Sequence, residues 1–566
     1  MRRRLILPVI PLAIAGLVLS GCATTTATTS PASVSDSGSA TTQATVTIDS
    51  DLAADAVLAA DADATVVRDD EWSASDAVDV DLSSPSSGSG VEIDGSTVTI
   101  TTAGVYRLSG SLDGSVVVAA PDDAQVVLIL DDASIANTAG PAIDVQTADD
   151  VAISLADGTS NTVSDASSYA DDASANAAIY ADADLTITGT GSLEVRGNGN
   201  DGIASTDDLA ILSGTITVDA ADDGLRGKDA LVVEGGTIDV TAGGDALKSD
   251  DDQDAAAGYI AISGGAITAT SGDDGLTAAT DVVVTDGTVD LTTTGSDGAK
   301  GIVAGVVVAI DGGDVTVDAA DDAIHSDGSV GIGGGTARLS SGDDGMHAEA
   351  TLEIRAGDVT VAKSSEGLEG KDIAISGGTV SVTSDDDGVN ASAGSSGSGG
   401  GQGGGSMADG GETLVISGGT LTVSAQGDGL DSNGSMTISG GDTVVYGPTG
   451  QGNGALDTNG GLTVTGGTVV ALGSAGMAET PDPSSAQQWV AASVSGSAGD
   501  RIQITDASGA VVASFTAEKD YATVVYTSPD IVDGATYSFG VNGSSAATAT
   551  EGTALAGGMG GGPGRR

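Results

Sequence analysis

The chain has 566 residues, of which 81 are acidic and 18 are lysine or arginine, and its formal net charge is −63. This charge excludes nucleic acid as a natural partner, because the phosphate backbone would repel the protein. Hydrophobic residues still make up 39% of the chain, which is not typical of a disordered polymer, and the single cysteine excludes a disulfide framework.

The N-terminus predicts secretion. Three arginines precede an apolar run that ends at Leu19-Ser-Gly-Cys22, which is the order of a secretory signal. The run is shorter than the roughly 20 residues of a membrane span, and its ending resembles a lipobox. We therefore expect residues 1–21 to be a lipoprotein signal peptide and Cys22 to be lipidated, anchoring the protein to the outer face of the cell membrane. The alternative is an ordinary signal peptide with a coincidental cysteine.

The next segment predicts a linker. Residues 22–90 are rich in Ala, Thr, Ser and Asp and have no sustained hydrophobic period. We expect a flexible tether, in which short strands remain possible.

An internal repeat dominates the chain after residue 90. An acidic residue followed by Gly or Ala and usually an aliphatic residue recurs about every 22 residues, and longer intervals coincide with an acidic insertion at 249–254 and a Gly/Ser-rich loop at 394–411. The acidic positions are Asp201, Asp223, Asp245, Asp274, Asp297, Asp322, Asp344, Glu366, Asp387 and Asp428.

Between these acidic turns, two alternating apolar strands flank a glycine pair, as in residues 260–270. Short strands joined by corners, without helices, predict an all-β fold, a right-handed parallel β-helix of about 12 to 14 coils over residues 91–480. We expect a β-rich cap at 481–545 and a Gly-rich tail at 546–566.

The phased acids predict bound calcium. Equivalent residues of adjacent coils stack about 4.8 Å apart, where two carboxylates repel by roughly 3.5 kcal/mol at an effective dielectric near 20. Calcium accepts many oxygen ligands with tolerant geometry and would relieve this repulsion. The alternative is that Asp-Gly is favourable turn chemistry and that acids keep the surface soluble. The candidate metal ligands are Asp201, Asp222, Asp223, Asp245, Asp250, Asp273, Asp274, Asp297, Asp321, Asp322, Asp343 and Asp344.

The few cations lie close to the acidic turns. Lys228, Lys248 and Lys300 each follow such a turn by three to five residues, and Arg226 precedes Lys228. One interpretation is that they neutralise the acids. The other is that Arg226, Lys228, Lys248 and Lys300 contact a ligand, with Lys228 or Lys248 as weak candidates for a catalytic base. The two histidines, His325 and His347, lie in equivalent turns and should stack as neighbours.

Several motifs together resemble the bacterial carbohydrate-binding domain-containing lipoproteins, a family of calcium-binding β-helices related in fold to pectate lyases. They include Ala103-Gly-Val-Tyr-Arg-Leu-Ser-Gly110, Leu185-Thr-Ile-Thr-Gly-Thr-Gly191 and Gly224-Leu-Arg-Gly-Lys-Asp229. The resemblance implies calcium at the turns around Asp201 to Asp245 and an extracellular polysaccharide partner, acidic or cellulosic. The chain departs from ordinary sugar-binding modules in its shortage of aromatic residues.

Three functions follow as hypotheses. The first is a non-catalytic polysaccharide-binding protein of the cell surface. The second is a calcium-dependent lyase of the pectate type, although acids and lysines in nearly every coil give no single catalytic centre. The third is an adhesin or spacer that calcium stiffens.

Overall fold

The computed structural model describes residues 52–170, 173–296, 298–393 and 408–555. The predicted signal peptide, Cys22 and most of the Gly/Ser-rich loop lie outside the described residues. Among the described residues, no helix has the length and apolarity of a membrane span.

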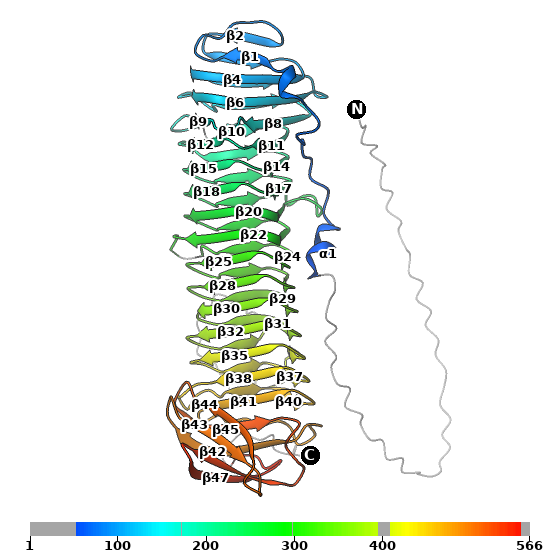
Figure 1. Ribbon diagram of the computed structural model, residues 1–566, viewed down its shortest axis with the longest axis vertical. Helices are drawn as coiled ribbons and strands as arrows, with labels where there is room; N and C mark the ends of the chain where they lie inside the picture. The colour runs from blue at the N-terminus through cyan, green and yellow to red at the C-terminus, as the bar shows by residue number, and fades with distance from the viewer. Residues whose placement is uncertain (1–51, 171–172, 297, 394–407, 556–566) are drawn as a thin grey trace, which may run out of the picture. The chain divides into compact units, whose positions relative to one another are not determined.

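The described chain forms the predicted all-β parallel solenoid, with about 15 turns of ~23 residues each. Figure 1 shows the coils stacked along one axis. Each coil contributes up to three strand positions, which pair in parallel with the same positions of the next coil except at the antiparallel hairpin of residues 91–100. The result is three faces around one core of Val, Ile, Leu and Ala.

The first face, named the strap face, is formed by β1 (Val78–Asp81), β4 (Gly104–Asp113), β6 (Gln125–Ala136), β8 (Asp150–Leu155), β11 (Asp184–Gly189), β14 (Asp208–Ile211), β17 (Ala230–Val233), β20 (Tyr259–Ser271), β22 (Asp281–Thr293), β24 (Val307–Ile310), β27 (Ser329–Ile332), β29 (Met346–Ile354), β31 (Leu368–Ile375), β34 (Thr413–Ile416), β37 (Ser435–Ile438) and β40 (Gly461–Val464).

The second face, named the threonine face, contains the later parts of β4, β6, β20 and β22 together with β9 (Ser160–Ser164), β12 (Ser192–Gly197), β15 (Thr215–Ala220), β18 (Thr237–Ala242), β25 (Asp314–Asp318), β28 (Thr336–Ser340), β30 (Asp358–Lys363), β32 (Thr379–Ser384), β35 (Thr420–Ala425), β38 (Asp442–Tyr446) and β41 (Thr468–Gly473).

The third face, named the ladder face, contains the first parts of β29 and β31 together with β2 (Val91–Asp94), β3 (Thr97–Ile100), β5 (Ser115–Ala119), β7 (Ile143–Thr147), β10 (Ala177–Ala181), β13 (Asp201–Ser205), β16 (Leu225–Gly227), β19 (Leu247–Ser249), β21 (Leu276–Ala278), β23 (Ile302–Ala304), β26 (Ile324–Ser326), β33 (Val389–Ala391), β36 (Leu430–Ser432) and β39 (Leu456–Thr458).

The glycine pairs form the corner between the strap face and the threonine face. Gly236, the second residue of the pair Gly235-Gly236, and Gly357, which follows Ala356 at the equivalent corner, have φ of +92° and +88°, a left-handed conformation that residues with a Cβ adopt only at a cost. A Cβ on Gly357 would also lie 2.8 Å from the carbonyl oxygen of Gly334 in the preceding coil. The glycine therefore permits both the sharp turn and the close stacking of coils.

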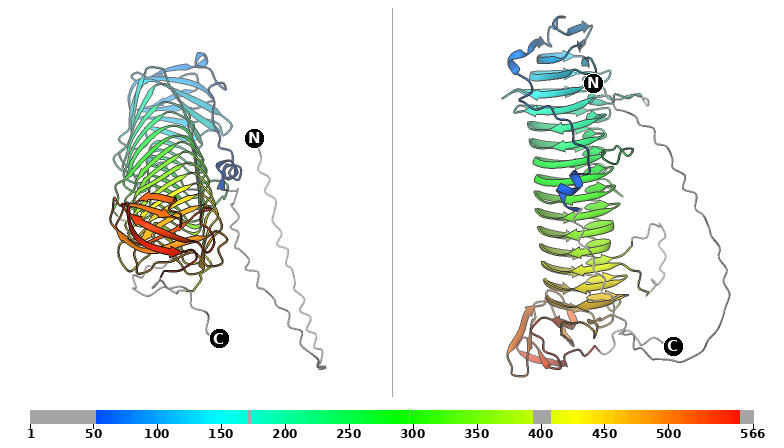
Figure 2. Two further views of the ribbon diagram at one scale, coloured as in Figure 1. Left: turned by 60° about the horizontal axis from the view of Figure 1, so that its bottom comes forward. Right: turned by 90° about the vertical axis from the view of Figure 1, so that its right-hand side faces the viewer.

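Residues 22–90 were expected to form a flexible tether, but the described part of this segment packs against the coils. From Leu52 onward it packs along the strap face and includes α1 (Ala54–Leu58) and η2 (Ala74–Asp76) (Figure 2). Ala54 and Val57 are buried against Val283 and Ala309 of the coils. Thr65 N–H donates to Asp208 Oδ2 at 2.7 Å. Residues 52–72 are therefore a strap on the β-helix.

The C-terminal cap extends beyond the expected boundary. β45 (Tyr521–Thr527) pairs antiparallel with both β41 and β42 (Trp489–Gly496), so it ends the stack of coils. A second sheet is formed by β43 (Arg501–Thr505), β44 (Val511–Thr516), β46 (Thr536–Val541) and β47 (Ser544–Thr550). Because β47 completes this sheet, the first residues of the expected tail, 546–566, belong to the cap.

Candidate cation-binding face

Most of the phased acids form one column at the entrance to the ladder face. In most coils the acidic residue stands two residues before the short strand, and in β13 it is the first residue of the strand. The next coil places its counterpart beside it. Gly224 N–H, for example, donates to Asp245 O at 2.9 Å, and Ala246 N–H donates to Asp274 O at 3.0 Å. We name this column the aspartate ladder: Asp201, Asp223, Asp245, Asp274, Asp322, Asp344, Glu366, Asp387 and Asp428.

The sequence predicts Asp297 at one position of the aspartate ladder. The structure has Lys300 at that position. The register pairs Leu276 with Ile302, so the residue in phase with Asp274 is Lys300. Gly275 N–H donates to Lys300 O at 3.0 Å, the same bond that the other rungs make. Asp297 itself lies outside the described residues. The spacing of an Asp-Gly dipeptide does not reveal that Lys300 takes this ladder position.

Backbone N–H groups satisfy one oxygen of most ladder carboxylates. Asp245 N–H donates to Asp223 Oδ1 at 2.9 Å, and Asp274 N–H donates to Asp245 Oδ1 at 3.0 Å. Asp344 N–H donates to Asp322 Oδ1 at 3.0 Å in the same way. Each carboxylate thus joins its coil to the next, so the ladder has a structural role before any ion is considered.

A second column lies three residues after each ladder position, at the outward-facing centre of the short strands. We name it the flanking column. Its members from Arg226 onward are Arg226, Lys248, Thr277, Val303, His325, His347, Glu369, Asn390, Asp431 and Asp457. Cationic side chains stand at its N-terminal end and acids at its C-terminal end, so the two halves of the ladder have different electrostatic surroundings.

Protein cations neutralise the N-terminal half of the ladder. Lys248 Nζ lies 3.1 Å from Asp223 Oδ2 and 2.8 Å from Asp245 Oδ2. Burial alone would lower the pKa of Lys248, but hydrogen bonds and charges from Asp245 and Asp223 outweigh it and raise this pKa. Arg226 Nη2 lies 2.8 Å from Asp250 Oδ2. These geometries match charge neutralisation, one of the two roles expected for the cations.

The same contacts argue against the two lysines as catalytic bases. Lys228 Nζ lies 2.5 Å from Asp251 Oδ2 and 3.3 Å from Asp229 Oδ1. The hydrogen bond to Asp251 is the main cause that raises the pKa of Lys228. A general base needs a pKa near the working pH. The pKa values of Lys228 and Lys248 are instead raised, which moves them farther from neutral pH.

The predicted metal ligands gather in two groups. The carboxylate oxygens of Asp245, Asp273 and Asp274 lie within 4.8 Å of one another. A second group of the same kind contains Asp321, Asp322 and Asp343, and Lys300 Nζ lies 2.6 Å from Asp321 Oδ2 and 2.8 Å from Asp322 Oδ2. Asp201, Asp222, Asp223 and Asp250 join neither group, and Asp344 belongs to another group with His347 and Glu369.

The C-terminal half of the ladder lacks such partners among the described residues. No protein cation lies within ion-pair distance of the described side chains of Glu366, Asp387, Asp428, Asp431 or Asp457. Burial, with the charges of neighbouring acids, raises the pKa of Glu366 and of Asp431 to about 8. By contrast, hydrogen bonds from His325 and Lys300 outweigh burial and lower the pKa of Asp322 to about 2. Counter-charge therefore lowers the pKa of Asp322, although burial still raises the pKa of Asp201 beside Arg226 and of Asp344 beside His347 to about 7.

Asn390 lies beside the C-terminal half of the ladder and has a side-chain oxygen without a hydrogen-bond partner. It stands in the flanking column between Glu369 and Asp431, and only 8% of it is exposed. Its Nδ2 donates to Glu366 Oε2 at 2.8 Å, whereas its Oδ1 is buried without a hydrogen-bond partner. We name Glu366, Asp387, Asn390, Asp428, Asp431 and Asp457 the acidic segment. Its oxygens suit a hard, oxygen-preferring cation such as calcium.

The sequence prediction missed most of the acidic segment as a site. Glu366, Asp387 and Asp428 belong to the phased acids for which the sequence predicts calcium but not to its candidate metal ligands, and the sequence does not single out Asn390, Asp431 and Asp457. The signal that could have found them is the spacing of three residues from each ladder acid. This spacing brings the two side chains together on one short strand.

Known proteins share features with this chain. Residues 94–345 match the model of the family described as carbohydrate-binding domain-containing protein, so this part of the chain is similar to that family. A carbohydrate-binding domain-containing protein of Acetivibrio thermocellus is 35% identical over 136 residues, which are 23% of this chain and 48% of that relative. The match therefore spans about half of the relative's length.

A solved structure is also similar in sequence. It is the polysaccharide lyase-like protein from C. thermocellum, as a gadolinium derivative, with 33% identity and a TM-score of 0.38. The similarity covers 42% of this chain and 96% of that one.

Replacing a ladder acid should destabilise the coils through the lost backbone bond. In Asp223→Ala the buried N–H of Asp245 loses its acceptor, and we expect the free energy of unfolding to fall by about 1–3 kcal/mol. Asp223→Asn retains an acceptor oxygen and should lose less. Denaturant unfolding measures both, with the exposed neighbour Asp222→Ala as control. Equal stability of Asp223→Ala and the control would contradict the structural role of the ladder.

The acidic segment should make stability depend on pH. Its raised pKa values mean that the folded state holds protons that the unfolded state releases, so the stability that these groups contribute is present at low pH and is lost as pH rises toward 8. With divalent cations removed, the melting temperature should fall between about pH 5 and 8. Asp431→Asn should flatten this dependence, whereas the exposed Asp385→Asn should not. If the melting temperature of Asp431→Asn depended on pH as steeply as that of the unchanged protein, the raised pKa of Asp431 would be contradicted.

Proposed function

We propose that this chain is a calcium-binding, polysaccharide-binding protein of the cell surface, anchored through lipid on Cys22. The observation that carries the proposal is the match of residues 94–345 to the carbohydrate-binding domain family. The N-terminal signal motif supports export and anchoring.

The threonine face offers the polysaccharide a regular polar surface. Neighbouring coils alternate a hydroxyl and a charged side chain along its central column: Thr162, Glu194, Thr217, Asp239, Thr268, Asp290, Thr316, Arg338 and Thr360. Coils are about 4.8 Å apart, so charges recur about every 10 Å. A polymer with repeating hydroxyl groups can bond along such a column, which compensates for the shortage of aromatic residues.

A depression at one end of this face supports the same assignment. It is lined by Thr162, Val163, Ser164, Glu194 and Arg196, which lie on β9 and β12. Arg196 Nη2 and Nε both donate to Glu194 Oε1, at 2.5 and 2.9 Å. The depression presents donors, acceptors and a small apolar patch, the mixture that a sugar ring with polar edges requires.

Calcium fits best at the acidic segment rather than at the turns around Asp201 to Asp245. The latter acids already have Arg226 and Lys248 as counter-charges. The described acids of the acidic segment have no protein cation at ion-pair distance, and Asn390 Oδ1 is buried there without a hydrogen-bond partner. We infer that calcium replaces protons there and supplies the charge that lysines supply in the N-terminal half.

Binding is favoured over lyase chemistry. The ion-paired lysines are poorly suited as bases, because their pKa values are raised. The acids and lysines are also spread along many coils. We therefore assign the polysaccharide a role as a bound partner rather than as a substrate.

Retention on insoluble polysaccharide tests the proposal. The full chain should bind polygalacturonate or cellulose in calcium, and Thr217→Val/Thr268→Val/Thr316→Val should reduce retention at least several-fold without lowering the melting temperature. Threonine-to-valine changes on the cap, Thr516→Val/Thr548→Val, are the matched control.

Two outcomes would contradict the proposal. No retention on either polysaccharide with calcium present would reject carbohydrate binding. Release of unsaturated uronide, detected by its ultraviolet absorbance, would replace the non-catalytic assignment with a lyase. The calcium component is tested separately by calorimetry, in which Asp387→Asn/Asp431→Asn should weaken calcium binding and Asp222→Asn should not.

A further inference from the structure

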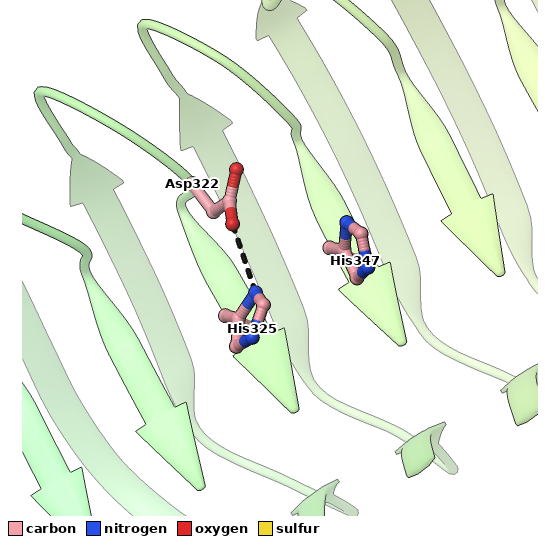
Figure 3. Close-up of side chains that lie close together, drawn as sticks. All are labelled: Asp322, His325 and His347. Carbon is pink, nitrogen blue, oxygen red and sulfur yellow. Dashed lines mark hydrogen bonds and ion pairs between the residues drawn. The ribbon is translucent and has the colours of Figure 1, made fainter. Parts of the chain in front are cut away.

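The two histidines of the chain lie side by side in adjacent coils. His325 is at the centre of β26 and His347 is near the start of β29, and the register pairs them directly. Their ring centroids are 4.9 Å apart and the planes are tilted by 31°. Figure 3 shows both rings extending from the same face of neighbouring strands. The chain contains no other histidine.

Ladder and flanking carboxylates surround the pair. Asp322 Oδ2 lies 2.9 Å from His325 Nδ1 (Figure 3). Asp344 Oδ2 and Glu369 Oε2 lie 3.0 and 3.1 Å from His347 Nδ1. Both histidine side chains are largely buried, with exposed fractions of 16% and 15%. The imidazoles and carboxylates thus face one another in a partly enclosed space.

The ligand atoms are close enough to share an ion. One atom from each of Asp322, His325 and His347 lies within 4.8 Å of the others, and the same holds for Asp344, His347 and Glu369. Asp322 is held in place because its other oxygen accepts the N–H of Asp344 at 3.0 Å. A rigid sheet with an anchored carboxylate is the kind of support that orients metal ligands.

The donor set differs from that of the rest of the ladder. Imidazole nitrogen with carboxylate oxygen is the combination preferred by zinc and its first-row neighbours, whereas calcium takes oxygen ligands. Elsewhere the flanking column uses Arg226 and Lys248, which cannot bind a metal as charged groups. Only at His325 and His347 does this column provide nitrogen ligands.

Lys300 and two outer acids also face the pair. Lys300 Nζ lies 2.8 Å from Asp322 Oδ2 and retains Asp321 as a second partner at 2.6 Å. Asp327 lies 3.3 Å from His325 Nε2, and Glu349 lies 3.8 Å from His347 Nε2. A metal ion would release Lys300 from Asp322 without leaving the lysine unpaired, and the surrounding acids favour a dication.

We propose that His325 and His347, with Asp322 and a carboxylate of Asp344 or Glu369, bind one transition-metal ion of the zinc type. The site is separate from the acidic segment, and its test does not depend on calcium or polysaccharide binding.

The test uses the full chain without a histidine tag. Calorimetry with zinc should give one tight site per chain, and millimolar calcium should leave its occupancy unchanged. His325→Gln and His347→Gln should each weaken zinc binding at least tenfold, whereas Asp222→Asn should not. Circular dichroism confirms that the variants remain folded.

Cobalt gives a second measurement on the unchanged protein. Bound Co²⁺ should produce visible absorption bands and shifted imidazole proton signals in the NMR spectrum, and both should disappear when zinc is added. Absence of zinc binding, displacement of zinc by calcium, or wild-type affinity in both histidine variants would each overturn the proposal.

Discussion

The stacking of carboxylates one strand spacing apart is the constraint on which the rest of this structure depends. A repeat of about 23 residues per turn places equivalent acids beside one another in coil after coil, and like charges at this distance repel strongly unless something intervenes. The backbone provides the first compensation, because ladder N–H groups donate to the carboxylate of the preceding coil. This bond fixes the side chain but leaves its charge in place.

The second compensation is counter-charge, and the chain distributes it unevenly. Lys300 even replaces an acid within the ladder, which lowers the density of negative charge at the centre of the column. Toward the N-terminus the flanking side chains are Arg226 and Lys248, in the middle they are histidines, and toward the C-terminus they are Glu369, Asn390 and Asp431. The ladder face therefore presents three chemical environments along its length.

The sequence predicted the fold because period-two strands, glycine corners and phased acids all indicate the same coil. It also predicted the neighbouring histidines, since their spacing equals one repeat. The strap was not predicted, because its few apolar anchors, such as Val57 and Val67, follow no period and contact strands that are distant in the sequence. Lys300 was missed as a ladder residue because an insertion shifts the register, and the segment around Asn390 was missed because counter-charges become visible only once coils are stacked.

Hydrogen exchange of the full chain, resolved by peptide and compared with and without calcium, tests the central claim most directly. If calcium supplies the counter-charge that the protein lacks, amide protection should rise in the coils from 366 to 457 and change little in the coils from 201 to 254, where Arg226 and Lys248 already pair with the acids. Equal protection of both regions, or stronger protection of 201 to 254, would contradict the account.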